Sequence, residues 1–159
     1  MKKLLVQACC GCCATSFEKG DVTYFFNGDN FDTINEYKKR LEAMLTVDKD
    51  CIVEGYEAKV FDSCEECIAY RLRRCAEVAL ERGFDCFTTT LTVSPHKDSA
   101  MVNRIGREVA AEVGVPFLEL DLKKNNGFAK SVARSKQLGL YRQRYCGCGE
   151  SRRLKEPVV

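Results

Sequence analysis

The sequence predicts an α/β fold, a single three-layer domain around a mainly parallel sheet. The length of 159 residues suits one domain with a sizeable core. Short apolar stretches alternate with stretches of helical periodicity, the order that parallel βαβ units produce. Hydrophobic residues make up 45% and charged residues 30%, a globular composition and not a disordered one. We therefore take residues 1–159 as one domain, with a basic C-terminal segment at 123–155.

The first half of the chain predicts three strands and one helix. Lys3–Ala8 and Asp21–Phe26 are short apolar stretches that predict strands, the second closed by a turn at Asn27. A helix capped near Asp32 follows, since apolar residues recur at steps of three and four: Ile34, Tyr37, Leu41 and Met44. Cys51–Tyr56 predicts the third strand.

The second half continues the alternation. Ser63 and Glu66 fit a capping box, in which each side chain satisfies a backbone amide near the helix start, and Gly83 ends that helix. Cys86–Val93 is rich in β-branched residues and predicts a fourth strand. A further helix, which ends at Gly114, is predicted by apolar residues at helical spacing: Val102, Ile105, Val109 and Val113. Pro116–Leu120 predicts a fifth strand.

Cysteine is the unusual component, with eleven in 159 residues and a single histidine, His96. No apolar run approaches the roughly 20 residues of a membrane span, and the basic N-terminus lacks the apolar run of a secretory signal. We expect a cytoplasmic protein with no membrane partner. Thiols at this density in a reducing compartment indicate metal or redox chemistry, and one histidine excludes a site with several imidazole ligands.

Eight cysteines fall into three local groups: Cys9, Cys10, Cys12 and Cys13; Cys64 and Cys67; Cys146 and Cys148. The C-x-x-C pair lies on the first turn of the capped helix, where the helix end favours thiolates. Taken alone, this pair is compatible with half of a zinc site, half of an iron–sulfur site, a redox pair or core packing. Eight thiols are more than a plain zinc knuckle needs. We expect the other three, Cys51, Cys75 and Cys86, in the core.

Polar candidates gather where strands end, because ligands of open α/β sheets bind outside the carboxyl ends of the strands. Asn27 follows the second strand, and the threonine row that includes Thr89 and Thr90 favours a strand but also suits phosphate or ribose. The turn Ser94–Lys97 precedes a helix, whose start attracts anions. His96 is either a structural residue or a proton donor.

The C-terminal segment is basic, since residues 123–155 hold ten Lys and Arg against one acid. Tyr141 and Tyr145 interleave with Arg142 and Arg144, a pattern suited to stacking on bases and binding phosphates. The alternative is an exposed cationic edge without a partner. We expect one or two short helices here.

Five motifs, in order over residues 4 to about 153, together resemble the cobalamin-independent epoxyqueuosine reductases of the QueH type. They are Leu4-Leu5-Val6-Gln7-Ala8-Cys9-Cys10, Tyr24-Phe25-Phe26-Asn27, Cys64-x-x-Cys67-x-x-Tyr70-Arg71-Leu72, the run from Phe87 to Lys97, and Tyr141-x-x-x-Tyr145-Cys146-Gly147-Cys148. The resemblance implies reduction of the epoxide of epoxyqueuosine at the tRNA wobble position, the last step of queuosine synthesis. It also implies a HUP-type fold, a 4Fe–4S cluster, a second iron nearby and no cobalamin.

Carried over by position, the resemblance implies cluster ligands at Cys9, Cys10, Cys64 and Cys67. Cys146 and Cys148 correspond to a redox-active disulfide pair or to iron ligands, and Cys13 to a residue that helps to hold the second iron. Tyr145 and His96 are candidate proton donors. The expected partners are the tRNA anticodon stem-loop and an electron donor, and the expected substrate-binding residues are Asn27, Thr89, Thr90, Ser94, Lys97, Tyr141, Arg142 and Arg144.

Three departures from the family pattern stand out: Gln7 where members often have His, Cys12 where they often have Pro, and Asn27-Gly28 in place of an Asn-Pro turn. Cys12 adds a thiol beside the expected cluster. Two other functions compete with the reductase: a zinc-stabilised RNA-binding module without turnover, and a related iron–sulfur tRNA-modifying enzyme with a different substrate.

Overall fold

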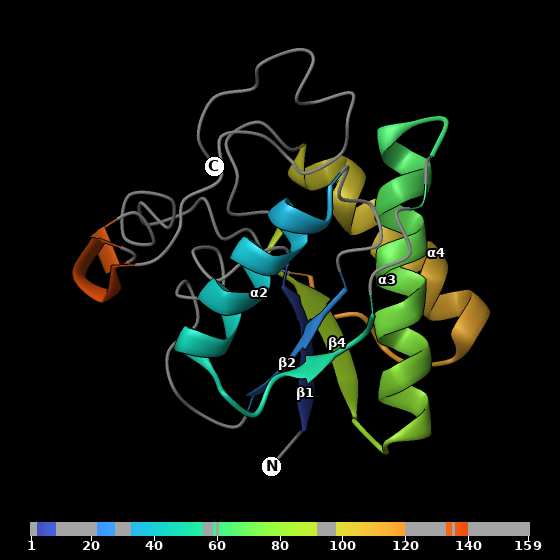
Figure 1. Cartoon of the computed structure of the whole chain (residues 1–159). Helices are drawn as coiled ribbons and strands as arrows, with labels where there is room; N and C mark the ends of the chain where they lie inside the picture. Colours follow the sequence, from blue (N-terminus) through green and yellow to red (C-terminus); the bar gives the residue numbers. More distant parts are fainter. Residues whose placement is uncertain are drawn as a thin grey trace.

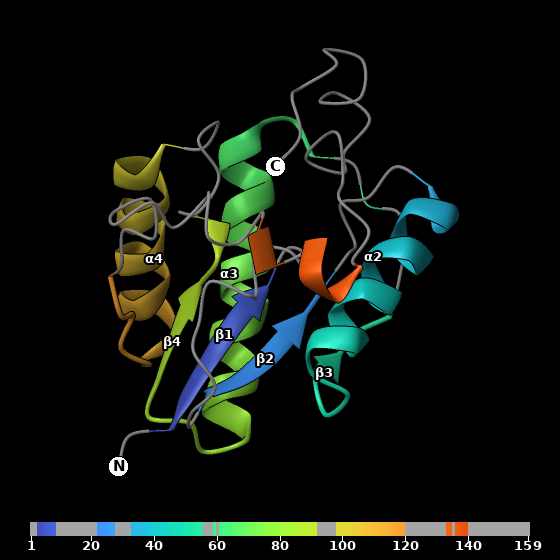
Figure 2. The same ribbon diagram turned by 90° about the vertical axis from the view of Figure 1, so that its left-hand side faces the viewer.

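The computed structural model describes residues 3–8, 22–27, 33–55, 59, 61–91, 98–119, 133–134 and 136–139. It confirms the predicted α/β fold, in which a parallel sheet lies between helices on its two faces (Figures 1 and 2). The elements, in chain order, are β1 (Leu4–Ala8), β2 (Val22–Phe26), α2 (Ile34–Val47), β3 (Ile52–Val53), α3 (Cys64–Glu81), β4 (Cys86–Thr89) and α4 (Ser99–Val113).

The four strands are parallel and have the order β3-β2-β1-β4. β1 therefore lies inside the sheet, paired with β2 on one side and β4 on the other. This is the strand order of the central part of a Rossmann-like sheet. Because the chain moves outward from β1 in both directions, the boundary between β1 and β4 is the point where the strand order reverses.

Alternate residues of the strands build two separate cores. Leu5 and Phe87 face α3 and α4 and pack against residues such as Ile68 and Leu72. The neighbouring residues, such as Val6, face α2. Both faces of the sheet are thus buried, as expected for a parallel sheet in a three-layer fold.

The predicted helix ends are largely confirmed. Ser63 caps α3, its Oγ accepting the Glu66 N–H at 3.1 Å, while the Glu66 carboxylate accepts the N–H of Asp62 at 3.2 Å. α3 ends just before Gly83, whose φ of 75° is in the left-handed region that favours glycine. The predicted cap near Asp32 is Thr33, the next residue, whose hydroxyl accepts the Glu36 N–H at the start of α2.

Three strands are shorter than the sequence predicts. β3 has two residues, although the Glu54 N–H also reaches the Phe26 carbonyl at 3.0 Å. β4 stops at Thr89, because the Thr89 hydroxyl accepts the N–H of Leu91 and turns the backbone. The predicted fifth strand is a single parallel bridge, in which Phe117 lies beside Phe87 at the outer edge of β4. In the C-terminal segment, residues 133–134 and 136–138 are helical.

The three cysteines predicted in the core differ in burial. Cys75 is fully buried and Cys86 is buried, as predicted, whereas Cys51 is half-buried. Burial raises the pKa of the Cys75 thiol well above its ordinary value. The pKa of the Cys51 thiol is raised to about 12, mainly by burial and to a smaller extent by the negative charge of the nearby Asp48. Both groups therefore remain neutral thiols at physiological pH, which separates them from thiolate ligands.

Within the described ranges, none of the helices combines the length and the apolar character needed to cross a bilayer.

Candidate functional site

The candidate site is the edge of the sheet where the strands end. All four strands point toward this edge, and α3 begins there and runs back along the sheet (Figure 2). The backbone confirms the direction of α3, since Asp85, just beyond its end, donates its N–H to the carbonyl of Lys3, at the start of β1. The ends of β1 and β4 and the start of α3 therefore lie at one edge, at the point where the strand order reverses and ligands of such folds bind.

A buried polar pair joins β1 and β4 at this edge. Gln7 and Thr89 are register partners, and both side chains are almost completely buried, with exposed fractions of 0% and 1%. The Thr89 hydroxyl donates to Gln7 Oε1 at 2.8 Å and accepts the N–H of Leu91 at 3.2 Å. Thr89 is thus engaged within the protein, and Gln7 is fixed in position next to the segment that holds the cysteine run.

The start of α3 carries the C-x-x-C pair. Cys64 is the first helical residue and is exposed, while Cys67, one turn later, is buried with an exposed fraction of 6%. Residues at i and i+3 share a helix face, and the amide groups of the first turn make this end of a helix electropositive. The capping box at Ser63 fixes where the helix begins. The pair is thereby held on one face of the first turn, a spacing that suits two sulfur ligands of one metal centre.

Arg71 adds a positive charge to the same side of α3. It follows Cys67 by four residues, and its side chain is fully buried, with an exposed fraction of 0%. A buried guanidinium is always charged and favours anions in its surroundings. The helix start and Arg71 together suit an anionic group that is bound by thiolates.

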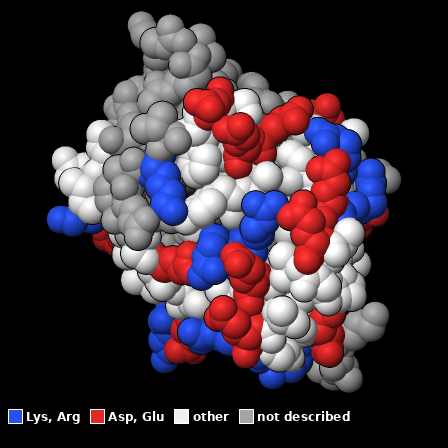
Figure 3. Space-filling view, turned by 90° about the vertical axis from the view of Figure 1, so that its right-hand side faces the viewer, with Lys and Arg blue, Asp and Glu red and all other residues white. Residues whose placement is uncertain are grey.

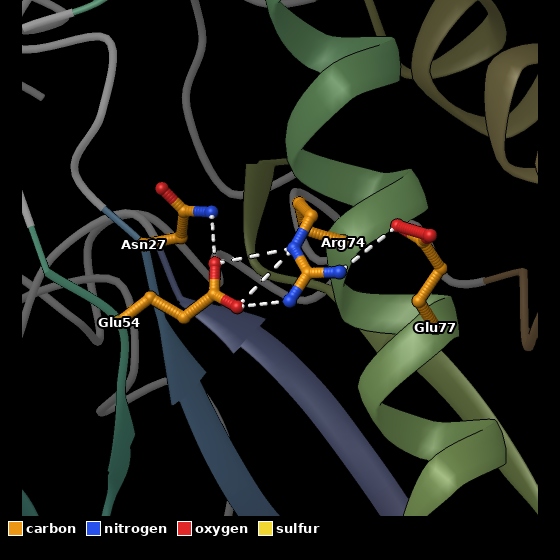
Figure 4. A network of polar contacts seen from close by, with 4 residues as sticks. All are labelled: Asn27, Glu54, Arg74 and Glu77. Carbon is orange, nitrogen blue, oxygen red and sulfur yellow. Dashed lines mark hydrogen bonds and ion pairs between the residues drawn. The ribbon is translucent and has the colours of Figure 1, made fainter. Parts of the chain in front are cut away.

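A second polar network ties the ends of β2 and β3 to α3 (Figure 4). Asn27 is fully buried, and its Nδ2 donates to Glu54 Oε2 at 2.9 Å. Glu54 also binds the Arg74 guanidinium, whose Nη1 donates to Glu77 at 3.1 Å. The hydrogen bonds to Glu54 raise the pKa of Arg74 above its ordinary value.

The structure places only some of the predicted site residues. Five of them lie at the carboxyl edge of the sheet, and all except the exposed Cys64 are buried: Cys64, Cys67, Asn27, Thr89 and Thr90. The others lie outside the described residues: Cys9, Cys10, Cys12, Cys13, Ser94, His96, Lys97, Tyr141, Arg142, Arg144, Tyr145, Cys146 and Cys148. Within the described ranges, no three His, Cys, Asp or Glu side chains converge as metal ligands. The ligand set and the substrate-binding roles stay predictions.

Sequence reasoning missed three residues of this edge: Gln7, Arg71 and Glu54. Gln7 and Arg71 stand inside the quoted motifs, but a lone amide or arginine there has no pattern that assigns it a contact. Two signals for Gln7 were available: it is a polar residue inside the apolar strand Leu4–Ala8, and it stands where family members often have His. Glu54 contacts Asn27, which is 27 positions away in the chain, and Arg74, which is 20 positions away. Local sequence patterns do not predict contacts over such separations.

Comparison with known proteins supplies the family. Residues 4–153 match the family model described as epoxyqueuosine reductase QueH. The chain belongs to this family. A relative named epoxyqueuosine reductase QueH from Thermotoga maritima is 33% identical, over 93% of this chain and 89% of the relative. Relatives of the same name from Streptococcus pyogenes serotype M1 and Dehalococcoides mccartyi are each 31% identical and cover 91% and 92% of this chain. The family is one of oxidoreductases.

The Asn27–Glu54 contact generates a prediction about stability. In the variant Asn27→Asp, a buried carboxylate replaces the donor amide and faces the Glu54 carboxylate. We expect a loss of about 3 kcal/mol in the free energy of unfolding near neutral pH, the size of a lost hydrogen bond to a charged group plus repulsion. Repulsion raises the pKa of the carboxyl pair, so the folded state binds protons more readily and the deficit shrinks as pH falls toward about 5.

Urea unfolding at both pH values measures this difference. The matched control is Glu77→Gln at the exposed end of the network, expected to cost less than about 1 kcal/mol at either pH. An Asn27→Asp variant as stable as the wild type at neutral pH would show that Asn27 does not hold Glu54 in place.

Proposed function

We propose that this protein is an epoxyqueuosine reductase that converts epoxyqueuosine in tRNA to queuosine. The observation that supports this most strongly is the family match, which spans residues 4–153 and so includes every cysteine group of the chain. The reaction removes the epoxide oxygen: two electrons and two protons convert the epoxide to an alkene and release water. We infer that the wobble position of tRNA carries the substrate, which makes this the last step of queuosine synthesis.

We further propose a 4Fe–4S cluster bound by Cys9, Cys10, Cys64 and Cys67, with a second iron beside it. The described residues fit such a group: two thiols at the start of a capped helix, the buried charge of Arg71 one turn away, and a buried amide at Gln7. These are features that stabilise a net negative, sulfur-rich group. When bound, the cluster supplies electrons and the iron supplies a Lewis acid for the epoxide oxygen.

The remaining chemistry falls to the chain's own residues. Tyr145 and His96 are the proposed donors of the two protons, since each has an exchangeable proton on a ring that fits beside a base. Cys146 and Cys148 are proposed as a redox-active pair or as iron ligands. In the first role, two thiols oxidised to a disulfide release two electrons, the number that one turnover requires.

We propose that the basic segment 123–155 binds the anticodon stem-loop. The face formed by α3 and α4 carries acidic and basic side chains side by side (Figure 3). Its arginines are paired with acids: Arg73 with Glu112, Arg104 with Glu65 and Glu108, and Arg107 with Glu119. A surface neutralised in this way attracts a phosphate backbone weakly. The C-terminal segment has the excess of positive charge that RNA binding requires.

The first test follows turnover. The anaerobically purified chain, given a chemical reductant and tRNA that contains epoxyqueuosine, is expected to yield a nucleoside lighter by one oxygen atom, detected by mass spectrometry. Cys67→Ala removes a proposed cluster ligand and should form no detectable product. Cys51→Ala removes a half-buried thiol that stays protonated and should keep about the wild-type rate. Product from Cys67→Ala at the wild-type rate would contradict the proposed ligand set.

The second test concerns tRNA binding. The double variant Arg142→Ala with Arg144→Ala should weaken tRNA binding and reduce the slope of log affinity against log salt by about 1.5, as expected for two lost phosphate contacts. The control, Arg73→Ala with Arg107→Ala, removes two arginines that already have acidic partners and should leave the slope unchanged. An unchanged slope in the first double variant would exclude Arg142 and Arg144 as phosphate contacts.

A further inference from the structure

The Gln7 side chain holds an unused hydrogen-bond donor in the interior. Its exposed fraction is 0%, and its Nε2 has no hydrogen-bond partner in the part of the chain that the structure describes. Leaving a buried donor unsatisfied destabilises the folded state, so such groups are rare and often mark a ligand or a functional contact. An apolar side chain at this position of β1 would avoid that cost.

The neighbouring hydrogen bonds determine which end of the amide is unused. The Thr89 hydroxyl oxygen accepts the N–H of Leu91 at 3.2 Å, and the hydroxyl has a single proton to donate. Its proton therefore goes to Gln7 Oε1, 2.8 Å away. With the amide reversed, that proton would lose its acceptor. The network thus holds the oxygen toward Thr89 and keeps the NH₂ group directed elsewhere.

This donor lies at the carboxyl edge of the sheet, where the candidate site is. Gln7 and Leu5 are alternate residues of β1, so Gln7 lies on the face covered by α3, where Leu5 belongs to the same buried core as Ile68 and Leu72. The same side of α3 carries the buried Cys67. In the sequence, Gln7 precedes Cys9 by two residues. The donor therefore lies at the reversal point between β1 and β4, on the sheet face that α3 covers.

We propose that the Gln7 amide donates a hydrogen bond to a sulfur atom of the iron–sulfur cluster and thereby raises its reduction potential. This inference rests on the proposed cofactor. Reduction adds negative charge that spreads over the sulfur atoms, and an N–H donor stabilises the reduced state more than the oxidised one. Gln7 is thus a positioning and tuning residue, and Thr89 keeps its amide in the donating orientation.

The test is an anaerobic redox titration of the cluster, followed by visible absorption and electron paramagnetic resonance. Gln7→Leu keeps a similar volume and removes the donor. We expect the equilibrium constant for reduction to fall about tenfold, a shift of about 59 mV to more negative potential for one electron. Thr89→Val keeps the Gln7 amide but removes the hydroxyl that holds its orientation. This variant should shift the potential in the same direction by a smaller amount.

Thr88→Val is the matched control. Thr88 is equally buried and also donates a hydrogen bond, to the Leu118 carbonyl at 2.7 Å, but it alternates with Thr89 and lies on the opposite face of the sheet. We expect this variant to lose some thermal stability and to keep the wild-type potential. The comparison separates an effect on the cluster from a general loss of stability.

Two results would overturn the inference. One is a wild-type potential in Gln7→Leu, which would mean that the donor serves only a buried water. The other is a shift in Thr88→Val as large as that in Thr89→Val. If Gln7→Leu does not retain the cluster, the two threonine variants test the inference: a shifted potential in Thr89→Val alone supports it, and a wild-type potential in Thr89→Val contradicts it. A wild-type chain that binds no iron–sulfur cluster contradicts the proposed function itself, whereas a normal cluster with an unchanged potential in the variants contradicts only the role of Gln7.

Discussion

The burial of β1 on both faces is the constraint on which the rest of the structure depends. β1 pairs with β2 and β4 along its backbone, and its side chains alternate between the core under α3 and α4 and the core under α2. A strand held in this way cannot slip by one residue without exchanging its two cores. Its register therefore fixes where it ends, and with it the position of Gln7 beside Thr89. In the sequence, the cysteine run begins two residues after Gln7.

The polar groups of this edge follow a common electrostatic pattern. The start of α3, the buried Arg71 and the buried amide of Gln7 all favour negative charge nearby. The Asn27–Glu54–Arg74 network, in contrast, is internally balanced and ties the ends of β2 and β3 to α3. One set of buried polar groups holds the edge together, and the other is suited to an anionic, thiolate-bound group. The family match gives that second set its proposed role.

Local patterns predicted most of the fold. Alternating strands and helices gave the parallel sheet, and Ser63 with Glu66 located the start of α3, because a capping box depends only on residues three apart. The ends of β4 and of the fifth strand were not predicted, since the Thr89–Leu91 turn competes with the strand preference of β-branched residues. The Gln7–Thr89 contact was beyond reach, because 82 positions separate the two residues and only the sheet register joins them. The motif cysteines pointed to this edge, and Cys64 and Cys67 do lie there.

The most direct measurement of the central claim is the iron and sulfide content of the anaerobically purified chain, taken with its visible spectrum. The account predicts a brown protein with about four irons and matching sulfide per chain, and further iron if the second site is filled. Cys64→Ala should lose both the colour and the sulfide. A colourless wild-type chain that carries a single zinc ion after anaerobic handling would contradict the account and favour an RNA-binding module without turnover.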